Sequence, residues 1–122
     1  MVMAAAALPA KEPNLETVAP NEFFEILEES RADGDAVLID VRTPGEYEAG
    51  HAPAAVNMDY YGADFREELD ALDRDGTYFL YCRSGSRSSR VLAMMTDMGF
   101  KEVYDLAGGW SGSSRRLAEV KD

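Results

Sequence analysis

The sequence has little of three residue types that often carry chemistry: one cysteine, one histidine and one tryptophan in 122 residues. A single cysteine, Cys82, excludes an internal disulfide and a zinc cluster built on several cysteines. It also excludes a resolving thiol, and with it two-cysteine redox chemistry. The fold must therefore be held together by packing, and we expect neither a metal nor an organic cofactor.

Positive charge is also scarce, with 12 lysines and arginines against 23 acidic residues and a net charge of −11. Phosphate backbones and anionic lipids would be repelled at long range, so nucleic acid and membrane are excluded as main partners. No apolar run approaches the roughly 20 residues of a membrane-spanning helix. Length and a 46% hydrophobic content are typical of one soluble domain, which we place at residues 14–122.

Residues 1–13 are rich in alanine and begin without positive charge. Their apolar run, residues 2–8, is at the short limit for the core of a signal peptide. We expect a flexible segment rather than a complete export signal, and a cytoplasmic protein. An expression remnant and a trimmed export leader stay open as origins of this segment.

Cys82 lies between two different patterns. The preceding run, residues 78–81, is aromatic or aliphatic without a break, as in a strand buried on both faces of a parallel sheet. From Ser86 onward apolar residues recur at helical spacing and stop at Gly99. Cys82 therefore begins a strand-to-helix loop, and we expect its side chain to point outward at the carboxyl end of the strand.

Such a loop can stabilise an anionic sulfur. Its backbone N–H groups can turn inward, and the helix start adds unpaired N–H groups and the positive end of its dipole. The side chains around the sulfur are three arginines, Arg83, Arg87 and Arg90, and three small residues, Ser84, Gly85 and Ser86. Most lone cysteines are inert core residues. Here the arginines and the glycine favour a reactive thiolate whose pKa the arginines lower.

Strand and helix patterns alternate along the chain. They predict strands near 15–18, 36–41, 55–58, 78–81 and 101–105, and helices near 22–30, 44–49, 63–72, 86–98 and 111–122. Alternation favours a three-layer α/β fold, with a mostly parallel sheet of about four to five strands and helices on both faces. Asp40 interrupts an apolar run and needs a partner, for which Arg42 or a loop N–H group is suited. Thr43 and Glu46 have the spacing of a capping box.

Four stretches of the sequence resemble motifs of one protein family, and they occur in the same order along the chain. The loop Cys82-Arg-Ser-Gly-Ser-Arg87-Ser88 resembles the active-site loop of the rhodanese sulfurtransferases, Cys-Arg-Ser-Gly-x-Arg-Ser. Residues 38–42 and 46–53 are similar to its Asp-Val-Arg and Glu-Tyr-x-x-Gly-His-Ile-Pro-Gly-Ala segments, with Ala52 and Ala54 as departures. Residues 99–110 are similar to the closing Gly-Phe-x-x-Val-x-x-Leu-x-Gly-Gly. The resemblance covers residues 15–118.

The resemblance implies a rhodanese-like fold and a thiosulfate sulfurtransferase. Cys82 would take a sulfane sulfur from a small anionic donor such as thiosulfate, hold it as a persulfide, and pass it to cyanide, a thiol or a protein acceptor. The donor-binding residues it implies are Arg83, Ser84, Gly85, Ser86, Arg87 and Ser88. Asp40 and Arg42 would support the loop from behind, and His51 would be a structural, loop-closing residue. We also expect residues 106–110 to form a flexible loop that borders the site, in which Trp110 either walls the site or packs on the core.

Two other functions use the same loop. A persulfide carrier would hand sulfur to a partner protein without meaningful turnover on small molecules. A cysteine phosphatase or arsenate reductase would also use a cysteine and an arginine, with the phosphatase spacing Cys-x5-Arg. Only four residues separate Cys82 from Arg87, and the narrower cradle favours a single sulfur atom over a tetrahedral oxyanion. No aspartate is evident as a general acid for a departing alcohol.

Overall fold

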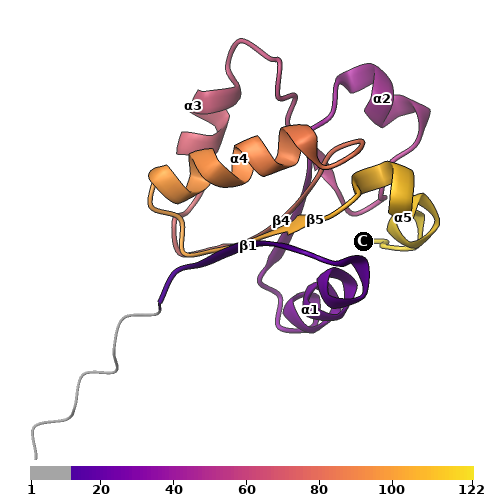
Figure 1. The fold of residues 1–122 in the computed structure, drawn as a ribbon, viewed down its shortest axis with the longest axis horizontal. Coiled ribbons are helices and arrows are strands. Elements are labelled where there is room, and N and C mark those ends of the chain that lie inside the picture. The colour runs from indigo at the N-terminus through magenta and orange to yellow at the C-terminus, as the bar shows by residue number, and fades with distance from the viewer. Residues whose placement is uncertain (1–11) are drawn as a thin grey trace, which may run out of the picture.

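The structure, a computed structural model, describes residues 12–122 and is organised around a five-stranded sheet (Figure 1). The strands are β1 (Asn14–Val18), β2 (Ala36–Asp40), β3 (Val56–Asn57), β4 (Thr77–Tyr81) and β5 (Glu102–Leu106). Their order across the sheet is β1-β5-β4-β2-β3, and every neighbouring pair is parallel. The predicted parallel sheet is confirmed, with all carboxyl ends at one edge.

Helices cover both faces of the sheet. They are α1 (Pro20–Ala32), α2 (Pro44–Ala49), α3 (Phe65–Asp70), α4 (Ser86–Asp97) and α5 (Gly109–Ala118). Figure 1 shows α3 and α4 on one side of the sheet and α1 on the other. Two separate hydrophobic clusters match this division: one contains buried residues of α1 and α5, the other those of α3 and α4. The predicted three-layer α/β fold is confirmed.

The largely aromatic and aliphatic composition of the central strand β4 follows from its position, because all five of its residues are buried. Phe79 and Tyr81 belong to the cluster beneath α1 and α5. Tyr78, Leu80 and Cys82 belong to the cluster beneath α3 and α4. Strand alternation therefore places the Cys82 side chain on the α4 face of the sheet.

Several predicted boundaries differ from the structure: α3 is Phe65–Asp70 rather than 63–72, and α5 ends at Ala118 rather than at residue 122. Helix α1 begins at Pro20 rather than at residue 22, because proline is well suited to the first helical position and Ala19 serves as the N-cap. Residues 106–110 are not the flexible loop that was expected: Leu106 ends β5 and Gly109 begins α5. Residues 1–11 of the predicted flexible segment lie outside the described residues. Within 12–122, none of the helices combines the length and apolar character that crossing a bilayer requires.

Candidate active site

Cys82 follows β4 directly and is 1% exposed. The expectation that its side chain points outward is wrong. Its register on the α4 face places the thiol beneath the start of that helix, and the loop of residues 83–85 turns back over it. Gly85 makes this turn possible, because it is the N-cap of α4 with a left-handed φ of 104° that other residues rarely adopt.

The loop amides turn toward the sulfur, as the sequence predicted. The N–H of Gly85 donates a hydrogen bond to Cys82 Sγ at 3.1 Å. Burial raises the pKa of the Cys82 thiol, but hydrogen bonds from the Ser88 hydroxyl and from the N–H groups of Ser88, Gly85 and Ser84 outweigh it. The thiol pKa therefore lies below its ordinary value, which favours the nucleophilic thiolate.

The arginines are not the main cause of this lowered pKa, contrary to expectation. Arg83 and Arg90 are exposed. Arg87 is directed to Glu46, to which it donates two hydrogen bonds at 2.7 and 3.0 Å, although the charge of Cys82 also raises the Arg87 pKa. Among the influences that lower the thiol pKa, those of Ser88 and the loop amides are the largest.

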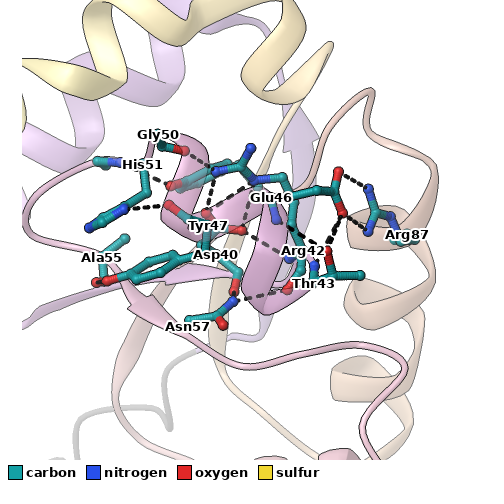
Figure 2. A network of polar contacts seen from close by, with 12 residues as sticks. Asp40, Arg42, Thr43, Glu46, Tyr47, Gly50, His51, Ala55, Asn57 and Arg87 are labelled. Carbon is teal, nitrogen blue, oxygen red and sulfur yellow. Dashed lines mark hydrogen bonds and ion pairs between the residues drawn. The ribbon is translucent and has the colours of Figure 1, made fainter.

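Glu46 lies in the site, although from the sequence it was expected only to cap a helix. The capping box is confirmed: the Thr43 side chain accepts from the Glu46 N–H, and Glu46 Oε1 accepts from the Thr43 N–H at 3.1 Å. The same carboxylate binds Arg87, and the hydrogen bonds from Arg87 are the main cause that lowers the Glu46 pKa to about 2 (Figure 2). Helix α2 is thereby fastened to the first turn of α4.

The predicted pairing of Asp40 with Arg42 is confirmed. Arg42 donates to both carboxylate oxygens of Asp40, the shortest contact being 2.7 Å, and both side chains are buried. Arg42 also donates to the Gly50 carbonyl at 2.6 Å and lies over the Trp110 ring at 4.7 Å. Asn57 donates to the backbone carbonyls of Asp40 and Arg42 (Figure 2). This cluster fixes the carboxyl end of β2 beside the Cys82 loop.

His51 contacts its own segment. Its Nδ1 lies 2.6 Å from the Tyr47 carbonyl oxygen, and its ring stacks on the Tyr47 ring with centroids 3.6 Å apart. Tyr47 in turn donates to the Ala55 carbonyl at 2.8 Å (Figure 2). These contacts are those of the structural, loop-closing residue that the resemblance implied.

The start of α5 fixes the outer side of the Cys82 loop, which the sequence did not reveal. The Trp110 N–H donates to the Cys82 carbonyl at 2.8 Å, and the Ser111 N–H donates to the Arg83 carbonyl at 2.9 Å. A Cβ at Gly109 would lie only 2.5 Å from the Cys82 carbonyl oxygen. Two carbonyls at the start of the loop are thus held by the first turn of α5. The only available sequence signal was the Gly-Gly-Trp run itself.

A hollow of about 350 Å³ opens beside the loop. Its lining residues are Arg42, Glu46, Ala49, Gly50, Arg83, Trp110 and Ser111. Trp110 therefore both walls the site and packs on the core, because it lines this hollow and also stacks on Tyr81. Of the predicted donor-binding residues, Ser84 and Ser86 are exposed, Gly85 is half-buried and Ser88 is fully buried. Cys82 itself lies behind the loop and does not line the hollow.

Within the described part of the chain, no three histidine, cysteine or acidic side chains are arranged to hold a metal ion. At Cys82 the described residues offer a thiol of lowered pKa that accepts a hydrogen bond from the loop N–H of Gly85. Such a site can attack an electrophilic sulfur and stabilise the negative charge that develops on the group that leaves.

Known proteins of similar sequence include sulfurtransferases. The chain is 37% identical over 91 residues to the putative sulfurtransferase YtwF of Bacillus subtilis, covering 72% of this chain and 85% of that protein. It is 37% identical over 76 residues to the thiosulfate sulfurtransferase GlpE of Pseudomonas syringae, covering 62% of this chain and 69% of that protein. It also matches longer proteins, and spans only 23% of the tRNA uridine(34) hydroxylase of Pectobacterium atrosepticum.

Solved structures share the fold. The crystal structure of a rhodanese-like domain protein from Staphylococcus aureus superposes with a TM-score of 0.65 at 23% identity, covering 78% of this chain and 87% of that one. The model of the rhodanese-like domain matches residues 23–115, which contain the Cys82 loop, Glu46 and the start of α5. The chain belongs to the rhodanese-like domain family.

Proposed function

We propose that the protein transfers a sulfane sulfur from a small anionic donor such as thiosulfate to a thiophilic acceptor, through a persulfide on Cys82. The observation that carries the proposal is the thiol itself: Sγ accepts a hydrogen bond from the Gly85 N–H, and its pKa is lowered by Ser88 and the loop amides. A sulfurtransferase needs an ionised thiol and stabilised negative charge, with little proton transfer.

In the first step the Cys82 thiolate attacks the outer sulfur of thiosulfate. A new S–S bond forms on Cys82, the S–S bond of thiosulfate breaks, and sulfite leaves with that electron pair. In the second step cyanide or a thiolate attacks the outer sulfur of the persulfide. The Cys82–sulfur bond breaks, the acceptor leaves with the sulfur, and the thiolate is regenerated.

The residues around the sulfur have distinct parts in this scheme. The N–H groups of Ser84, Gly85 and Ser88 stabilise the negative sulfur before and after transfer. Arg83, exposed at the edge of the hollow, guides the anionic donor toward the loop. Arg87, bound by Glu46, keeps the loop in shape and offers less of its charge to the donor than an unpaired arginine would.

Mass spectrometry after thiosulfate treatment tests the proposal directly. We expect the intact protein to gain the mass of one sulfur atom, located on Cys82 and removed by cyanide. Cys82→Ser should gain nothing, because a hydroxyl at this position is not ionised near neutral pH. The scheme would be discarded if the wild type formed no persulfide, or if Cys82→Ser gained sulfur to the same extent as the wild type.

The burial of Cys82 also favours a second candidate, a persulfide carrier that hands sulfur to a partner protein. At 1% exposure, a persulfide beneath the loop would be shielded from solvent between donor and acceptor. A steady-state assay with thiosulfate and cyanide distinguishes the two functions. Sustained thiocyanate production supports the enzyme, whereas one sulfur bound per protein without turnover supports the carrier.

A further inference from the structure

Within residues 12–122, the most exposed large apolar side chain is that of Tyr61, beside the candidate active site. It is 68% exposed, compared with 49% for Val56 and 37% for Val37. The guanidinium of Arg87, in the first turn of α4, lies over the Tyr61 ring at 5.7 Å from its centroid. An exposed apolar residue is ordinary on a protein surface, so what distinguishes Tyr61 is its place next to the Cys82 loop.

The backbone around Tyr61 is fixed, although its ring is exposed. The Tyr61 N–H donates to Asp59 Oδ1 at 2.9 Å, and the Gly62 N–H donates to the Asp59 carbonyl at 2.9 Å. The Tyr60 N–H donates to the carbonyl of Val41, directly after β2, at 3.1 Å. A side chain presented from a fixed turn loses little freedom when a partner binds it, and exposed tyrosines of this kind are typical of binding hot spots.

Two arginines near Cys82 keep their charge available. Arg83 and Arg90 are exposed, and neither forms an ion pair within residues 12–122. The turn that presents Tyr61 carries the acidic side chain of Asp59 instead. A partner that matches both parts of this surface therefore places acidic residues against the arginines and an apolar residue against Tyr61.

The extent of this surface indicates an acceptor larger than cyanide. Arg83, Trp110 and Glu46 line the hollow of about 350 Å³. Tyr61 lies outside the hollow, against Arg87, which an ion pair joins to Glu46 (Figure 2). Cyanide has two atoms and cannot contact Tyr61 and the hollow together. An extended peptide segment can, because each of its residues adds about 3.3 Å.

We propose that Tyr61, Arg83 and Arg90 form a docking surface for an extended segment of a partner protein, in which the cysteine that accepts the sulfur is flanked by acidic residues and an apolar residue lies against Tyr61. The inference rests on the proposed function and names the acceptor that this site takes. A second copy of the chain does not fit this description, because its one cysteine is buried.

Peptides that carry an activated disulfide test the docking surface without any sulfur transfer. The Cys82 thiolate attacks the cysteine sulfur of a peptide 2-pyridyl disulfide, a mixed disulfide forms, and pyridine-2-thiolate leaves with the electron pair and is measured by its absorbance. Three peptides of equal length carry glutamate, glutamine or lysine on both sides of the cysteine, and leucine beyond. The small uncharged 2-hydroxyethyl 2-pyridyl disulfide gives a reference rate, and dividing by it removes any effect on the thiol itself.

At about 0.15 M salt, where the overall field reaches about 8 Å, the glutamate peptide should react about threefold faster than the glutamine peptide, and the lysine peptide should be slowest. Arg83→Ala should reduce this preference. Tyr61→Ala should slow all three peptides about fivefold relative to the reference, and Tyr61→Phe, which keeps the ring, should restore their rates.

Lys101→Ala is the matched control for charge, because it removes one cation directly before β5, at the opposite edge of the sheet from Cys82. It should keep the preference for glutamate. An equal loss of preference in Lys101→Ala and Arg83→Ala would overturn the proposal, since overall charge would then explain it. Equal relative rates for the three peptides, or wild-type relative rates in Tyr61→Ala, would overturn it as well.

Treatment with thiosulfate separates this inference from the proposed function. Persulfide formation on Cys82 without a preference among the peptides keeps the sulfurtransferase and removes the docking surface. A preference among the peptides without persulfide formation discards the sulfurtransferase and leaves the docking surface standing.

Discussion

At the scale of single residues, Glu46 joins two segments that lie 41 positions apart. Its carboxylate accepts two hydrogen bonds from Arg87, and the two side chains are 28% and 15% exposed. We expect Glu46→Gln to lower the free energy of unfolding by about 1 to 2 kcal/mol, because a partly buried charge-assisted pair is worth more than a surface pair. Urea denaturation measures the loss.

The matched control is Asp70→Asn, which breaks the 2.6 Å pair with Arg74. Asp70 is 68% exposed, and pairs of this kind contribute from zero to about 1 kcal/mol. An equal effect of the two substitutions would show that partial burial adds nothing to the Glu46 pair.

The same residue gives a prediction for pH. The pKa of Glu46 falls from 4.5 to about 2 on folding, chiefly through the hydrogen bonds from Arg87. A depressed folded-state pKa contributes stability that is fully present above pH 4.5 and is lost as the pH falls toward 2. The difference in unfolding free energy between wild type and Glu46→Gln should therefore be constant near neutral pH and shrink below pH 4.5. A difference that grows in acid would contradict this assignment.

Residue types alone indicated much of this site, but not which groups touch. The order of residues around Cys82 was enough to predict a thiol surrounded by amides, and Asp40 with Arg42 was predictable because the two residues are close in sequence. The pairing of Arg87 with Glu46 was not, since it depends on how α2 and α4 approach each other. For the same reason the arginines were given an effect on the thiol pKa that belongs mainly to Ser88 and the amides.

At the scale of elements, the first turn of α5 is built against the Cys82 loop. Gly109 has a φ of 53°, and a Cβ there would lie 2.5 Å from the Cys82 carbonyl oxygen and 2.8 Å from the Arg83 carbonyl. Gly109→Ala should therefore cost at least about 2 kcal/mol and slow persulfide formation, because either the loop or the helix must move. Denaturation and the rate of sulfur uptake measure the two effects.

Gly112→Ala provides the control within the same helix. It has no atom within 4 Å of an added Cβ and no left-handed φ. Its stability should change by less than about 1 kcal/mol, and its rate of sulfur uptake should match the wild type. Equal behaviour of Gly109→Ala and Gly112→Ala would mean that α5 does not hold the loop.

The elements themselves were predictable wherever a local signal existed. The capping box fixed the start of α2 at Pro44, and the unbroken apolar run identified β4 as the central strand. The sequence suggested a flexible loop at 106–110 that borders the site. In the structure both glycines of this stretch have left-handed φ values that let α5 begin against a neighbouring backbone. Only tertiary packing distinguishes these two uses of glycine.

At the scale of the whole molecule, a net charge of −11 meets a proposed substrate that is an anion. Of the four arginines near the loop, Arg42 is bound by Asp40 and Arg87 by Glu46, whereas Arg83 and Arg90 are exposed. Local attraction therefore depends largely on Arg83, which lines the hollow. The overall field, which reaches about 30 Å at 0.01 M salt and about 8 Å at 0.15 M, opposes the approach of the donor.

Raising salt from about 0.01 M to about 0.15 M should therefore increase the second-order rate of persulfide formation from thiosulfate, because the long-range repulsion is screened more than the contact with Arg83. Arg83→Ala should be slower at every salt concentration and should gain proportionally more from added salt. Alkylation by uncharged iodoacetamide is the control and should hardly respond. A wild-type rate that falls with salt would mean that the arginines at the loop, and not the acidic surface, govern how the donor arrives.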